Sequence, residues 1–160
     1  MCGSTRAAQE CPSRQRAGET NAAREWCVTM RRGVTDLEWV LDHELLQAKR
    51  HRRFVSLAMV KSSDPALLRN LRDVTMRESD IFFEFSDNFG AILMSETCSA
   101  GAVAAVDRYK KSCQGQTDLR FGVGCFPEDN QAVVPGFVSM VYQRLRSAET
   151  QAPGTVIASG

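Results

Sequence analysis

Apolar residues change their spacing several times along this chain, and each change predicts a different element of secondary structure. A first apolar stripe follows Thr35-x-x-Glu38, a capping-box pattern, and predicts a helix that begins near residue 35. Its members recur at helical spacing: Leu37, Val40, Leu41, Leu45 and Ala48. The run FVSLAMV at 54–60 is short and contains aromatic and β-branched residues, which indicates a strand.

The next segment predicts a second helix followed by a hairpin. Asp64 and Pro65 suit the cap and the first turn of a helix that we expect to end near Arg77. The apolar stripe of this helix is Leu67, Leu68, Leu71 and Val74. IFFEF at 81–85 and AILM at 91–94 then predict two strands joined by a short tip at 86–90.

Three further elements complete the pattern. Ser99 suits the cap of one helix, and Pro135 suits the first turn of another. Between them, LRFGVGCF at 119–126 predicts a strand. The apolar stripes of the two helices are Val103, Val106 and Tyr109 in the first, and Val138, Val141, Tyr142 and Leu145 in the second.

The core elements follow the order β-α-β-β-α-β, with one helix before them and one after. This order is typical of the ferredoxin-like arrangement among α+β proteins. We therefore expect one four-stranded antiparallel sheet with helices on one face, in which 81–85 and 91–94 pair as the central hairpin.

Composition divides the 160 residues into three parts. Residues 1–34 are rich in Ala, Arg, Ser, Thr and Glu with little apolar periodicity, so we expect a mostly disordered segment. Residues 35–147 hold the predicted elements and form the expected domain. Residues 148–160, AETQAPGTVIASG, are expected to form a flexible tail.

Charge and cysteine content exclude several classes of function. The net charge of +1 does not favour nucleic acid, and the basic run KRHRR at 49–53 is better explained as a solvated helix end. The six cysteines form no CxxC pair and no Cys/His cluster, which argues against a zinc site or a disulfide framework. Reduced thiols and the lack of an apolar run of about 18 residues predict a cytoplasmic protein without a membrane span.

Four segments spread over about two-thirds of the chain resemble, in order, the GGDEF domain of diguanylate cyclases, which join two GTP molecules into cyclic di-GMP. DHELLQAKRHRRFVSLAMV at 42–60 is similar to that family's first helix and strand. RESDIFFEFSDNFGAILMSET at 77–97 is similar, without a gap, to its R-x-x-D motif, its five-residue signature and the following strand. FGVGCFPED at 121–129 resembles a later strand end, and Tyr142 matches a tyrosine of the last helix.

The resemblance implies that the catalytic residues are replaced. Cyclases hold two divalent metal ions with carboxylates, whose positions correspond here to Lys61 and Phe89. A phosphate-contacting lysine of the family corresponds to Leu145. The full signature loop reads Ser86, Asp87, Asn88, Phe89 and Gly90, without the two leading glycines that let a backbone approach phosphates. We therefore expect no cyclase activity, no bound metal and no cofactor.

The resemblance also implies a retained ligand site. In active family members the R-x-x-D motif binds the product, cyclic di-GMP, and here it is Arg77 and Asp80. A further family arginine corresponds to Arg108. This chemistry suits guanine, because an Arg fork meets O6 and N7, a carboxylate meets the N1 and N2 hydrogens, and a second Arg meets phosphate.

Two non-catalytic interpretations follow, besides a third, a residual enzyme, which the replaced metal ligands disfavour. The first is a non-catalytic receptor that binds cyclic di-GMP through Arg77, Asp80 and Arg108 and signals by contact with another protein. The second is a degenerate domain that binds only protein. In that case Arg77 is a helix-end cation, Asp80 a turn residue and Arg108 part of a solvated helix face. The protein partner is unknown in both, and a homodimer is compatible with either.

Overall fold

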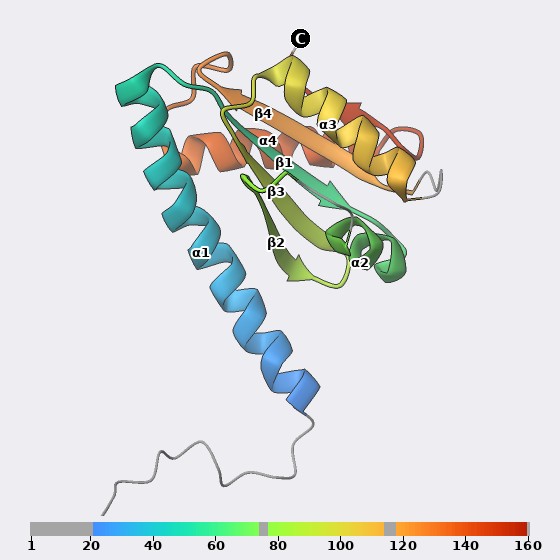
Figure 1. Ribbon diagram of the computed structural model, residues 1–160. Helices are drawn as coiled ribbons and strands as arrows, with labels where there is room; N and C mark the ends of the chain where they lie inside the picture. Colours follow the sequence, from blue (N-terminus) through green and yellow to red (C-terminus); the bar gives the residue numbers. More distant parts are fainter. Residues whose placement is uncertain (1–20, 74–76, 114–117, 160) are drawn as a thin grey trace, which may run out of the picture.

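Five strands and four helices make up the computed structural model, which describes residues 21–73, 77–113 and 118–159 (Figure 1). In chain order the elements are α1 (Asn21–His51), β1 (Val55–Lys61), α2 (Pro65–Asp73), β2 (Asp80–Ser86), β3 (Phe89–Ser95), α3 (Ser99–Ser112), β4 (Arg120–Phe126), α4 (Val134–Glu149) and β5 (Val156–Ile157). The predicted β-α-β-β-α-β core, with a helix on either side of it in the chain, is therefore confirmed.

All the strands belong to one sheet with the order β2-β3-β1-β4-β5. β1 pairs antiparallel with β3 and with β4, and β2 pairs antiparallel with β3. β5 is parallel to β4. The ferredoxin-like α+β class is confirmed, but two details are wrong: the sheet is a mixed one of five strands, and the β2–β3 hairpin lies at its edge rather than its centre.

Helices cover both faces of the sheet, whereas the sequence led us to expect only one covered face (Figure 1). On β1, Leu57 packs in a cluster with α1 and α4, while the adjacent Ala58 packs in a cluster with α2 and α3. Successive side chains of a strand point to opposite faces. The continuous apolar run of β1 is what a strand buried on both faces requires.

Helix α1 begins earlier than the capping-box pattern predicts. It spans 31 residues from Asn21, so 21–34 are helical where disorder was expected, and Thr35 lies inside the helix rather than at its cap. Residues 1–20 of the expected disordered segment lie outside the described residues. Extending an existing helix adds one hydrogen bond per ordered residue, whereas starting one is costly, so an internal capping pattern need not interrupt it.

The C-terminal segment is not the loose tail that its composition indicates. Helix α4 continues to Glu149, and β5 then adds to the sheet beside β4. The Ser159 hydroxyl donates to Oδ1 of Asp129 at 2.6 Å, next to a two-point contact in which Arg144 Nη1 and Nη2 donate to Asp129 at 2.8 and 2.7 Å. These long-range contacts tie the end of the chain to α4 and β4.

Two local boundaries also differ from expectation. Strands β2 and β3 extend into the predicted tip, so that only Asp87 and Asn88 form the turn. Helix α3 has Cys98 as its N-cap, and Ser99 donates its backbone N–H to the Glu128 carboxylate at 2.9 Å instead of capping the helix itself. Helix α2 ends at Asp73, and Val74 of its predicted stripe lies outside the described residues.

Candidate functional site

Asp80 is the first residue of β2 and follows a tight turn from Arg77. The Asp80 backbone N–H donates to the carbonyl of Arg77 at 2.9 Å. Asp80 is half-buried at the edge of the apolar core, whereas Arg77 is exposed. The structure therefore places both residues of the predicted motif at the entry to the edge strand.

Tyr109 of α3 reaches this turn from the core. It is fully buried, and its hydroxyl donates to Oδ2 of Asp80 at 2.6 Å. The other carboxylate oxygen, Oδ1, is also buried, yet it accepts no hydrogen bond from any residue that the structure describes. A buried acceptor without a donor costs about 1–3 kcal/mol, so a donor that reached Oδ1 would be stabilised there.

Arg108 contacts the ring of Tyr109, the residue that hydrogen-bonds to Asp80. Its guanidinium carbon is 5.2 Å from the centroid of the Tyr109 ring, and the side chain is otherwise exposed. A guanidinium over an aromatic face is attracted by the ring quadrupole. Tyr109 therefore contacts both residues: Asp80 of β2 through its hydroxyl and Arg108 of α3 through its ring.

The environment of Tyr109 keeps its hydroxyl protonated. Burial is the largest cause, followed by the hydrogen bond and the charge of Asp80, and together they raise the pKa of Tyr109 to about 12. The hydroxyl is therefore a hydrogen-bond donor at neutral pH. The apolar pattern of the sequence places Tyr109 only in a helix stripe, although a hydroxyl at a stripe position is a signal that a buried partner exists.

The guanidinium of Arg77 makes no hydrogen bond or ion pair with the described residues. Three residues that precede it in the chain, 74–76, lie outside that part of the structure. The structure thus joins Asp80 and Arg108 through Tyr109 and holds the Arg77 backbone against Asp80. Where the Arg77 side chain acts stays a prediction.

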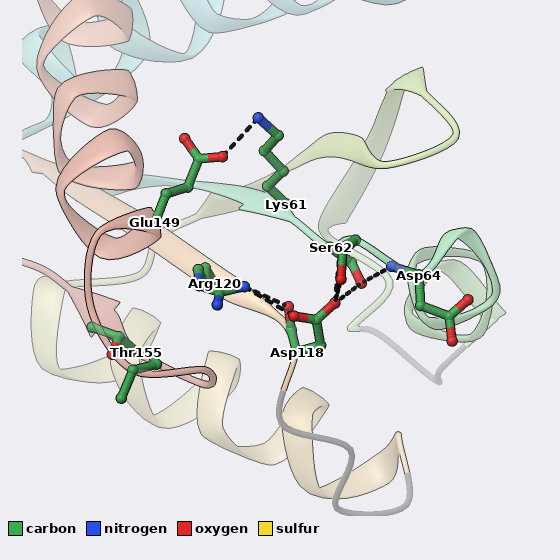
Figure 2. A network of polar contacts seen from close by, with 9 residues as sticks. Lys61, Ser62, Asp64, Asp118, Arg120, Glu149 and Thr155 are labelled. Carbon is green, nitrogen blue, oxygen red and sulfur yellow. Dashed lines mark hydrogen bonds and ion pairs between the residues drawn. The ribbon is translucent and has the colours of Figure 1, made fainter.

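The other predicted site residues lie at the far end of β1. Lys61 is in register with Phe89 on one side and Arg120 on the other. Its ammonium forms an ion pair with Glu149 of α4, with Nζ and Oε1 2.6 Å apart (Figure 2). Burial opposes ionisation of Glu149, but Lys61 and then Arg146 outweigh it and hold the pKa of Glu149 below its usual range.

A second carboxylate, Asp118, holds the loop between β1 and α2 (Figure 2). Its Oδ2 accepts the Ser63 backbone N–H at 2.8 Å and the Ser63 hydroxyl, while Oδ1 accepts Nη1 of Arg120 at 2.9 Å. The Ser63 hydroxyl is the largest cause that keeps the pKa of Asp118 below its usual range. The carboxylate of Asp118 therefore fixes the loop at the end of β1 through hydrogen bonds to Ser63.

The signature loop packs as an ordinary hairpin tip. Phe89 contacts Phe85 and the edge of Tyr142, with ring centroids 5.0 and 6.1 Å apart. The Ser86 hydroxyl donates to Oδ1 of Asn88 at 2.8 Å, across the turn. Gly90 is needed for packing, because a Cβ there would lie 2.8 Å from the carbonyl oxygen of Phe83.

The apolar replacements at this end of the sheet lie in or against the core. Leu145, at the position of the family's phosphate-contacting lysine, is fully buried, and Phe89 packs against the same cluster. Within the described residues, no cluster of three or more His, Cys, Asp or Glu side chains could hold a metal ion. None of the described helices is long and apolar enough to cross a bilayer.

Comparison with known proteins places the fold. No protein-family model matches the chain, and no curated protein sequence does. Among solved structures, the GGDEF domain of YfiN (TpbB) from Pseudomonas aeruginosa is similar, with a TM-score of 0.69 and 18% identity over 79% of this chain and 88% of that one. The GGDEF domain of DgcB from Caulobacter crescentus, in complex with c-di-GMP, has a TM-score of 0.66 and 8% identity over 76% and 87%.

A third similar structure is the diguanylate cyclase SiaD from Pseudomonas aeruginosa in complex with its activator SiaC. Its TM-score is 0.65 at 14% identity, over 78% of this chain and 57% of that one. At identities this low the likeness concerns the fold and not the residues of the site. The five-stranded mixed sheet between two pairs of helices is therefore the GGDEF fold.

Proposed function

We propose that this domain is a non-catalytic receptor that binds cyclic di-GMP through Arg77, Asp80 and Arg108 and signals by contact with another protein. The observation that carries the proposal is the state of Asp80. Its Oδ1 is buried and accepts no hydrogen bond from the described residues, while Oδ2 is held by Tyr109. A carboxylate oriented on one side and unsatisfied on the other is suited to accept a hydrogen bond from a ligand.

The charges around Asp80 suit a guanine dinucleotide. The N1 and N2 hydrogens of guanine are donors that a carboxylate oxygen accepts, and O6 and N7 are acceptors that an Arg fork meets. Arg77 is exposed beside Asp80, and Arg108 is exposed beside Tyr109. These two guanidinium groups supply a partner for the base and one for the phosphates, where charge-assisted hydrogen bonds are strong.

The non-catalytic part of the proposal is supported by the end of β1. Phosphoryl chemistry on GTP needs divalent metal ions to neutralise charge. The two metal positions implied by the resemblance are occupied by Lys61 and Phe89. Lys61 is ion-paired to Glu149, and Phe89 is packed on Tyr142. The ammonium of Lys61 repels a metal cation, and Phe89 offers no ligand atom.

Calorimetry tests the proposal. The purified chain is titrated with cyclic di-GMP and, separately, with cyclic di-AMP, whose adenine lacks the N1 hydrogen, the N2 amino group and O6. We expect micromolar binding of the first and none of the second. No heat with cyclic di-GMP at high micromolar concentration contradicts the receptor function, and equal binding of both dinucleotides contradicts recognition of guanine.

A domain that binds only protein is the second candidate, and one observation favours it. Trp39 on α1 is 74% exposed and stacks on His43, and Leu46 on the same helix is 54% exposed. Exposed large apolar residues are typical of protein contact surfaces. SiaD was solved with a protein activator, which is consistent with a protein partner for this fold. Failure of nucleotide binding would leave this function in place.

A further inference from the structure

Tyr109 joins two side chains that the proposed ligand needs. Its hydroxyl hydrogen-bonds to Asp80, and its ring lies under the guanidinium of Arg108. The two partners come from different elements, β2 and α3, and Tyr109 belongs to the packed core between them. A substitution at Tyr109 therefore alters the surroundings of both Asp80 and Arg108.

The hydroxyl is not needed for packing alone. Burying a hydroxyl costs free energy unless it is hydrogen-bonded, and phenylalanine fills nearly the same volume without that cost. Among the described residues, Asp80 is the partner that satisfies it, at 2.6 Å. The hydroxyl thus serves to orient the carboxylate, because a half-buried Asp80 without this donor has two unsatisfied oxygens and turns toward water.

The ring has a separate effect on Arg108. The guanidinium lies 5.2 Å from the ring centroid, within the range of a cation–π contact. Such a contact restricts a long, exposed side chain to fewer rotamers before a ligand arrives, so less entropy is lost on binding. An aliphatic residue at this position keeps the core filled but gives Arg108 no such partner.

We infer that Tyr109 is a positioning residue of the dinucleotide site, which orients Asp80 through its hydroxyl and Arg108 through its ring. The inference rests on the proposed function, since it concerns the same ligand. It adds a residue of α3 that is not part of the R-x-x-D motif and that touches no ligand itself.

Affinity measurements on matched variants test the two effects separately. Tyr109→Phe removes only the hydroxyl, and we expect cyclic di-GMP binding to weaken roughly 3- to 10-fold in calorimetry. Tyr109→Leu also removes the ring and is expected to weaken binding about 2- to 5-fold further. Tyr142→Phe is the matched control, because Tyr142 is the only other tyrosine and packs on Phe89 at the other end of the sheet. It should bind as wild type does.

A spectroscopic measurement on the wild-type chain does not depend on any variant folding. With tyrosine labelled with ¹³C only at Cζ, the carbon that bears the hydroxyl, the chain gives two tyrosine signals, one from each tyrosine. Saturation with cyclic di-GMP should shift the Tyr109 signal, because a guanine donor on Oδ1 changes the charge that its hydroxyl meets, and should leave the Tyr142 signal in place. A purely structural tyrosine would show no ligand-dependent shift.

The outcomes separate the two proposals. If wild-type chain does not bind cyclic di-GMP, the proposed function fails. If wild-type chain binds but Tyr109→Phe, shown to be folded by its thermal transition, binds equally well or more tightly, the receptor function stands and the positioning role is overturned. A Tyr109 signal unmoved by saturating ligand overturns it as well.

Discussion

Lys61 at the end of β1 and Glu149 at the end of α4 form an ion pair, with Nζ and Oε1 2.6 Å apart. The ammonium stands at the position where the GGDEF resemblance implies a metal carboxylate. The lysine is already neutralised by a carboxylate from another element, and Phe89 beside it in register is packed on an aromatic ring. At this end of the sheet, Lys61 is therefore paired with Glu149, and Phe89 is packed on Tyr142.

The ion pair between Lys61 and Glu149 leads to a prediction about catalysis. Purified chain incubated with GTP and Mg²⁺ or Mn²⁺ should form no cyclic di-GMP, measured by chromatography of the reaction products. Exchanging Lys61→Asp alone should not create activity, since Phe89 still provides no second ligand. Turnover by the wild-type chain that disappears when residues 86–90 are mutated would contradict the non-catalytic proposal.

Ligand binding should depend on the motif and not on the signature loop. Arg77→Ala and Asp80→Ala each remove a charge-assisted hydrogen bond of about 1.5–3 kcal/mol, so the affinity for cyclic di-GMP should fall roughly 10- to 150-fold in calorimetry. Asp87→Ala is the control, because Asp87 is exposed in the hairpin turn at the other end of β2. Wild-type affinity in Arg77→Ala would be incompatible with the proposed site.

Alkaline pH should reveal the bond between Tyr109 and Asp80. The pKa of Tyr109 is raised from 10.0 to about 12 in the folded chain, chiefly by burial and then by Asp80. A raised pKa contributes stability that is fully present below pH 10 and is lost as the pH rises from 10 toward 12. The wild-type free energy of unfolding should therefore fall over this window by on the order of 2 kcal/mol more than that of Tyr109→Phe.

Urea unfolding of both proteins at several pH values between 9 and 12 measures this difference. Ultraviolet absorbance of tyrosinate follows the titration of Tyr109 directly in a Tyr142→Phe background. Asp80→Asn should lower the pKa of Tyr109, because it removes the negative charge beside the hydroxyl. An unchanged titration in Asp80→Asn would mean that burial alone sets the pKa.

The C-terminal part of the domain should depend strongly on one arginine of α4. Arg144 pairs with Asp129, whose side chain is only 6% exposed, and also donates to the Val123 carbonyl at 2.7 Å. Arg144→Ala leaves a buried carboxylate without its charge partner, and we expect a loss of about 3 kcal/mol in the free energy of unfolding.

Arg146→Ala is the matched control for this variant. Arg146 is on the same helix and its pair with Glu149 is more exposed, so its removal should cost less than about 0.5 kcal/mol. Urea denaturation at neutral pH compares the two. Equal losses for both variants would show that the Asp129 contact is not specially stabilising.

Much of the local structure was determined by the sequence alone. The short apolar run at 54–60, with its β-branched and aromatic members, predicted a strand, and β1 occupies it almost residue for residue. Asp64 was expected to cap α2, and its Oδ1 accepts the backbone N–H of Ala66 at 2.9 Å. These features depend on neighbours along the chain, so spacing and propensity were sufficient to locate them.

Helix ends and the tail were predicted less well because other parts of the chain decide them. The N–H of Ser99 is satisfied by Glu128, 29 residues away, and not by a local cap. The tail forms β5 because β4 offers it a free edge. Residues 156–157 carry no strand signal strong enough to stand alone, and composition indicated disorder.

The candidate site shows the same division. The resemblance of the sequence to GGDEF domains implied Arg77, Asp80 and Arg108, but the apolar pattern assigned Tyr109 only to a helix stripe. Only the tertiary structure brings Tyr109 to Asp80 across 29 positions, and Lys61 of β1 to Glu149 of α4. Hydrogen bonds and ion pairs of this kind depend on which faces of the elements pack together. The strand order and the two helix layers decide that packing, and the local periodicity of the sequence contains no information about either.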